Sequence, residues 1–71
     1  MSRQPIESEA LQSVGYDAAR RVLEVEFTSG EVYRYFDVPE HEHVALLQAD
    51  SSGAYFVEHV RNAGYRFEHR N

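Results

Sequence analysis

Residues 21–36 read RVLEVEFTSGEVYRYF, and this stretch decides the fold. Leu23, Val25 and Phe27 recur at every second position, which is the pattern of a strand with one buried side. Residues 31–36 are rich in valine, tyrosine and phenylalanine, which favour strands. The intervening Thr28-Ser29-Gly30 is typical of a turn. The stretch therefore predicts a β-hairpin.

The length of this turn sets the side of the sheet on which the tyrosines lie. A two-residue loop would place Arg34 among buried residues, where an unpaired guanidinium is costly. A three-residue loop with a left-handed Gly30 shifts the register by one residue. We favour this second register, because it turns Tyr33 and Tyr35 toward the core. It predicts three cross-strand pairs: Leu23 with Tyr35, Glu24 with Arg34 and Val25 with Tyr33.

Upstream of the hairpin, residues 11–16 form a third extended segment with Val14 and Tyr16 on one face. Gly15 in its interior indicates a bulge or the close approach of another backbone. Residues 1–9 are polar and are expected to be a flexible lead-in.

Downstream, two helices follow. Pro39 suits the first position of a helix over residues 40–49, with Val44, Leu47 and His43 spaced for one face. A second helix is expected over about residues 53–62, with apolar Phe56, Val57 and Val60 on one face and serines before it as N-cap candidates. Gly64 is a left-handed helix stop.

This order predicts an α+β fold, in which an antiparallel sheet packs against two C-terminal helices. The sheet has three strands, or four if residues 65–68 also form one, giving β-β-β-α-α(-β). The domain is expected over residues 10–68, with a frayed C-terminus at residues 69–71.

Composition limits the chemistry. The chain has 71 residues, no cysteine, and a formal net charge of -5 from 12 acidic residues and 7 arginines. The absence of cysteine excludes disulfides and thiolate metal sites, and it favours an intracellular protein. We expect a cytoplasmic location, because no signal peptide or membrane span is visible. The acidic balance argues against general affinity for nucleic acids.

Several short motifs occur along the chain in an order and spacing that match a known domain family. They are Ser13-Val14-Gly15-Tyr16-Asp17, residues 23–27, Gly30, Tyr33-Arg34-Tyr35, Val38-Pro39, residues 49–56 and Val60-Arg61. Together they resemble the KTSC domain, a short bacterial domain named from the C-terminus of some lysyl-tRNA synthetases, over roughly residues 8–67. The family's mark is a Tyr-x-Tyr, matched by Tyr33 and Tyr35. The resemblance implies a domain of unknown role, for which RNA binding has been suggested.

Candidate contact residues for a partner are Tyr33, Arg34, Tyr35 and Arg61. Tyrosine rings, with Phe27 and Phe36 nearby, stack on bases, and arginine binds phosphate. The other interpretation is a half-buried strand covered by helices.

No combination of residues predicts catalysis. Glu24 and Glu26 share the outer face of the strand and are expected to be solvated, and the four histidines lack the spacing of a metal helix. We expect a non-enzymatic interaction domain without metal or cofactor, whose partner is a protein or, alternatively, RNA. The sequence leaves open a monomer or a weak homodimer.

Overall fold

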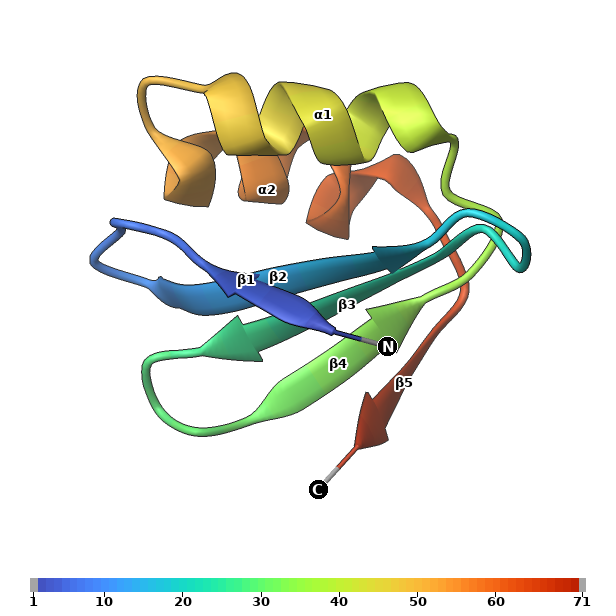
Figure 1. The fold of residues 1–71 in the computed structure, drawn as a ribbon, viewed down its shortest axis with the longest axis horizontal. Coiled ribbons are helices and arrows are strands. Elements are labelled where there is room, and N and C mark those ends of the chain that lie inside the picture. Colours follow the sequence, from blue (N-terminus) through green and yellow to red (C-terminus); the bar gives the residue numbers. More distant parts are fainter. Residues whose placement is uncertain (1, 71) are drawn as a thin grey trace.

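The computed structural model describes residues 2–70 and contains one antiparallel sheet with two helices on one face. The sheet is a five-stranded meander in the order β1-β2-β3-β4-β5 (Figure 1). Its elements are β1 (Arg3–Pro5), β2 (Leu11–Asp17), β3 (Val22–Phe27), β4 (Val32–Tyr35), α1 (Glu40–Gln48), α2 (Ser52–His59), the 3-10 turn η1 (Arg61–Ala63) and β5 (Phe67–Arg70). The α+β class and the two helices are confirmed.

The number of strands differs from the prediction of three or four. The order is β-β-β-β-α-α-β, because residues of the expected lead-in form β1 and residues near the C-terminus form β5. β1 has no apolar alternation and all three of its residues are exposed, so only its pairing with β2 makes it a strand. β5 includes His69 and Arg70, which we expected to be frayed; Asn71 lies outside the described residues.

The register of the β3–β4 hairpin is the predicted one. Val25 pairs with Tyr33, Glu24 with Arg34 and Leu23 with Tyr35. Gly30 has φ 95°, and its N–H donates to the carbonyl oxygen of Phe27 at 2.9 Å. The left-handed glycine thus closes a three-residue loop and fixes which side chains face the helices.

Gly15 marks a close backbone approach, one of the two roles expected for it. A Cβ atom at this position would lie 2.5 Å from the carbonyl oxygen of Ser2, the residue that precedes β1. The bulge occurs elsewhere in β2, between Leu11 and Ser13. It lets Leu11 and Val14 both reach the core despite their odd spacing.

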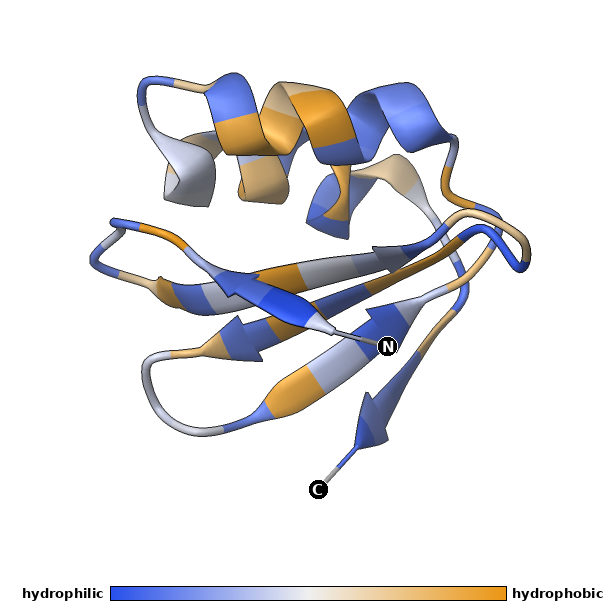
Figure 2. Cartoon of the chain, viewed as in Figure 1, coloured by the Kyte–Doolittle hydropathy of each residue, from blue (hydrophilic) through white to orange (hydrophobic). Residues whose placement is uncertain are grey.

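The helices cover the inner face of the sheet with fewer side chains than we expected. Leu46 is the buried residue of α1. Of the three residues expected on its buried face, His43 and Leu47 are half-buried, whereas Val44 is 42% exposed and does not belong to that face. In α2, Phe56 and Val60 are buried as predicted, but Val57 is 38% exposed. Figure 2 shows apolar residues in the middle of α1 and at intervals along the strands beneath the helices. None of the described helices has the length and apolar character needed to cross a membrane.

The N-terminus of α2 is capped as predicted, but the helix ends at His59 rather than near Asn62, and the predicted stop at Gly64 belongs to the turn η1. The Ser51 hydroxyl accepts a hydrogen bond from the Ala54 N–H at 3.2 Å. Gly64, with φ 89°, ends the turn η1 in the left-handed conformation.

A side-chain hydrogen bond joins the two helices, because the Tyr55 hydroxyl donates to Glu42 Oε1. That bond raises the pKa of Tyr55 to about 12, and burial adds to the rise.

Replacing Gly15 with alanine should destabilise the sheet. The new methyl group would overlap the Ser2 carbonyl, so β1 must shift, at a cost of about 1–3 kcal/mol. Urea unfolding measures the loss, and Gly53→Ala is the matched control because its methyl group would meet side chains at ordinary distances of 3.5 Å and 3.7 Å. Equal stability of Gly15→Ala and the wild type would contradict the close approach.

The Tyr55–Glu42 bond should make the chain lose stability at alkaline pH. The folded-state pKa of Tyr55 lies above its ordinary value, so the contribution is complete below about pH 10 and is lost as pH rises toward about 12. Tyr55→Phe removes the hydroxyl, so the free energy of unfolding should fall less at alkaline pH in this variant than in the wild type, by roughly 1 kcal/mol. Urea unfolding from pH 8 to pH 11 measures it. Parallel curves for both proteins would show that the bond contributes nothing.

Candidate functional site

The inner face of the sheet carries an aromatic groove beside α2, with a volume of about 620 Å³. Five rings line it: Phe27, Tyr33, Tyr35, Phe56 and Phe67. β3 and β4 supply three of them through the register set at Gly30, α2 supplies one, and β5 supplies the last. The rings contact each other at centroid distances of 5.4–6.5 Å, mostly edge to face or tilted. Such contacts hold the rings in fixed orientations.

The rings differ in how far they reach the solvent. Tyr35 is 5% exposed and packs edge to face on Phe56, so it belongs to the core. Burial raises the pKa of Tyr35, to which Tyr33 adds, whereas Arg61 opposes the rise. Tyr33 is half-buried, and the His69 ring stacks on it at 4.7 Å. Phe67 is 57% exposed and stands at the mouth of the groove.

The polar groups of the groove lie around its rim. Arg61 and Asn62 of η1 are part of the lining, and so are Ser29 and Glu31 of the hairpin loop. Among residues 2–70, Arg61 supplies the one arginine or lysine side chain of the lining, and Glu31 supplies its one carboxylate. The groove therefore combines an aromatic floor with a single guanidinium at the rim.

Of the four predicted contact residues, the structure brings three together. Tyr33, Tyr35 and Arg61 line the groove. Arg34 lies on the opposite face, as alternation along β4 requires. Phe36, expected beside the tyrosines, also faces away, and the Arg66 guanidinium lies over its ring at 4.7 Å.

The sequence interpretation missed Phe56 and Phe67 as groove residues. Phe56 lies on the predicted apolar face of α2, but nothing in the sequence places it in a groove. The alternation of Tyr65 and Phe67 indicated a final strand, but the place of that strand beside β4 could not be inferred from it. The pairing of Tyr35 with Phe67 is what brings the exposed ring to the groove.

The outer face of the sheet is held by charged side chains. Glu24 is 7% exposed, which corrects the expectation of a solvated carboxylate. Its Oε1 lies 3.1 Å from Arg3 Nη1, and its Oε2 lies 2.7 Å from Arg34 Nε. Glu26 accepts a hydrogen bond from the Ser13 hydroxyl at 2.8 Å. The two arginines cover Glu24 and exclude water from it.

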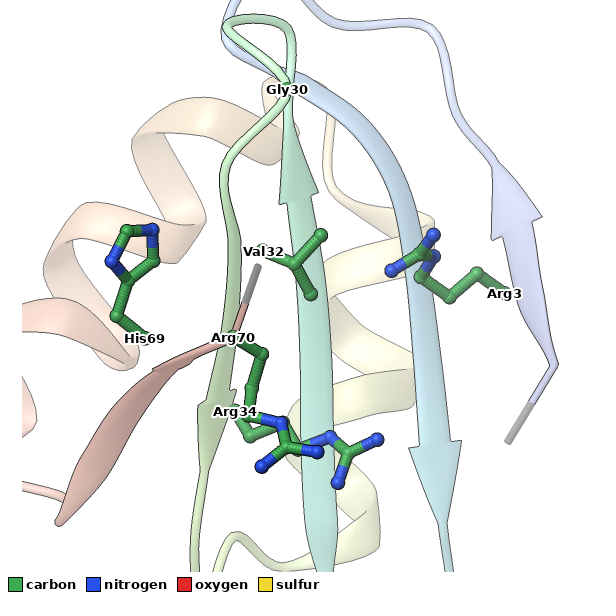
Figure 3. A pocket seen from close by; sticks show the side chains of 6 residues that line it. All are labelled: Arg3, Gly30, Val32, Arg34, His69 and Arg70. Carbon is green, nitrogen blue, oxygen red and sulfur yellow. The ribbon is translucent and has the colours of Figure 1, made fainter.

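A shallow depression adjoins this cluster and is lined by Arg3, Arg34 and Arg70 (Figure 3). The ring of His69 points away from the three guanidinium groups, toward the other side of β5. Each arginine has a carboxylate neighbour: Glu24 for the first two, and Glu68 at 3.4 Å for Arg70. The charges are thus largely compensated within the sheet. Among residues 2–70, no group of three or more histidine, aspartate and glutamate side chains is arranged to hold a metal ion.

Comparison with known proteins identifies the family. The model of the KTSC domain matches residues 7–65. The chain belongs to the KTSC domain family.

Relatives and a solved structure agree with this assignment. An uncharacterised protein of Stutzerimonas stutzeri is 45% identical over 67 residues, which cover 94% of each chain. A protein of Tsukamurella paurometabola is 42% identical over 52 residues, covering 73% of this chain and 78% of its own. The crystal structure of the KTSC domain protein YPO2434 from Yersinia pestis superposes with a TM-score of 0.94 at 31% identity, covering 99% of this chain and 97% of that one. The names of these relatives describe no catalytic activity.

Replacing Glu24 with glutamine should test the outer cluster. Two guanidinium groups would lose their shared anion in a poorly solvated place, so the free energy of unfolding should fall by about 2 kcal/mol. Urea unfolding at low and moderate salt measures the change. Glu58→Gln is the matched control, because the Glu58 side chain is 73% exposed. If the free energy of unfolding falls by the same small amount in both variants, the ion pairs of Glu24 do not stabilise the sheet.

Proposed function

We propose that this KTSC domain is a non-enzymatic interaction module, and that its aromatic groove binds a short segment of a partner protein. The segment carries an aromatic or large aliphatic side chain for the groove and a carboxylate for Arg61. The observation that carries the proposal is the exposure of Phe67, 57% of whose surface meets solvent beside four less accessible rings.

The chemistry of the groove supports a protein segment. Exposed apolar surface with a polar rim is typical of sites that bind other proteins. A volume of about 620 Å³ lies in the range of sites that bury a drug-sized ligand, which suits a short peptide segment with a large apolar side chain. The single guanidinium of Arg61 favours one anionic group in the ligand, and a carboxylate within a mainly apolar segment meets that condition.

RNA fits the groove less well. A base needs the open face of a ring, but Tyr35 is 5% exposed and Tyr33 already stacks with His69. Phosphate contacts need several cations, and Arg34 lies on the other face of the sheet. The net charge of -5 opposes a polyanion as well.

A titration of the ¹⁵N-labelled chain should test the groove. The probes are a pool of blocked octapeptides (about 1 mM in total), each with one phenylalanine or leucine next to an aspartate. A second pool has serine in place of the apolar residue, and a third probe is single-stranded uridine decamer. We expect amide shifts at Tyr33, Asn62 and Phe67 with the first pool alone.

The matched variants are Phe67→Ser and Val44→Ser, since both remove an exposed apolar side chain. Phe67→Ser should abolish the shifts, and Val44→Ser, in α1 outside the groove, should leave them unchanged. Shifts with the uridine decamer that weaken as salt rises would instead assign the site to RNA. No shift with any probe would contradict groove binding.

A further inference from the structure

The two edges of the sheet differ in their capacity to accept another strand. At one edge, β1 has three residues, and the alternation of its bonds with β2 points residues 3 and 5 outward. Residue 5 is a proline, which has no N–H to offer, so this edge is protected. The edge at β5 has no proline, and all four of its residues are exposed. Figure 1 shows β5 on the outside of the sheet.

The hydrogen bonds between β4 and β5 show which backbone groups of β5 point outward. The Phe36 N–H donates to the Arg66 carbonyl oxygen at 2.8 Å, so Arg66 directs its backbone groups toward β4. Because an antiparallel ladder alternates, Glu68 does the same, whereas Phe67 and His69 direct theirs away from the sheet. Within residues 2–70, no further strand lies on that side of β5.

We propose that this edge binds β5 of a second copy of the chain, in an antiparallel pair centred on Phe67. The two sheets then form one continuous sheet, and both helix layers lie on the same side. Phe67 of each copy contacts Phe67 of the other, which shields from water the most exposed large apolar side chain among residues 2–70. The two aromatic grooves become neighbours across the axis.

Apolar contact and charge complementarity together select this register. With Phe67 opposite itself, Arg66 faces Glu68 of the other copy, and Glu68 faces Arg66, giving two opposite-charge pairs. A shift centred on Glu68 would oppose two glutamates and set Arg66 against Arg70. A shift centred on His69 would also give two opposite-charge pairs, Glu68 with Arg70 and Arg70 with Glu68, but it would leave Phe67 without its counterpart. Arg66 and Glu68 both lie on the outer face with Phe36, so these pairs form away from the grooves.

Sedimentation of the full chain without any ligand should test the pairing. Between about 10 μM and about 1 mM, the mass should rise from monomer toward dimer. Arg66→Glu and Glu68→Arg should each weaken the dimer about tenfold or more, because each puts like charges opposite one another twice. The double variant Arg66→Glu/Glu68→Arg should restore it. A monomer at the highest concentration, or a double variant as weak as the single ones, would overturn the proposal.

Disulfide cross-linking of single-cysteine variants gives a second test of the register, one that does not depend on the charges. The chain has no cysteine of its own. Phe67→Cys should oxidise readily to a covalent dimer, since opposed Cα atoms in such a ladder lie about 5.5 Å apart, within reach of a disulfide. His69→Cys should oxidise much more slowly, because its counterpart lies four residues further along the pair. Faster linkage through His69→Cys would refute the register centred on Phe67. These experiments use no peptide, so the dimer can fail to form while groove binding succeeds. Both proposals use Phe67 and therefore compete: at concentrations where the dimer forms, the peptide-induced shifts should weaken.

Discussion

The left-handed backbone at Gly30 sets the register of the β3–β4 hairpin, and most later contacts in the molecule depend on that register. A slip of one residue would move every side chain of β4 to the other face of the sheet. Tyr33 and Tyr35 would then stand among the glutamates, and Arg34 would enter the core. Because the turn has three residues, Tyr35 packs against Phe56 and Arg34 reaches Glu24. One backbone conformation therefore defines both the aromatic groove and the charged outer face.

The outer face shows why a small sheet benefits from buried charge. A sheet covered by helices on one side leaves its other side in water. That side needs side chains whose apolar parts cover the strands while their polar groups meet the solvent or each other. Arg3 and Arg34 extend their aliphatic stems over the strands while their guanidinium groups hold Glu24. β1 is attached largely through this contact and its backbone bonds to β2.

The sequence predicts the hairpin, its register and the left-handed glycines, because each follows from local chemistry or from simple alternation. It predicts the two helices within a few residues, but not the face that α1 buries. In that helix, Val44, Leu46 and Leu47 offer two equally plausible apolar stripes, and only contact with the sheet selects Leu46. β1 could not be predicted, since nothing in Arg3-Gln4-Pro5 favours a strand without β2 beside it.

In the candidate site, too, some features follow from the local sequence and others depend on long-range contacts. Alternation along β4 already implies that Arg34 and the two tyrosines face opposite sides, so a single surface containing all of them was excluded by the preferred register. The presence of Phe67 and Arg61 in the groove is a long-range result of the path through α2 and η1. Tyr35 is buried in the core, whereas Tyr33 and Phe67 keep accessible surface on the groove side of β4 and β5. Because recognition there would rest on apolar contact and one guanidinium, salt should affect it much less than it affects phosphate binding, and this difference separates a protein ligand from a nucleic acid.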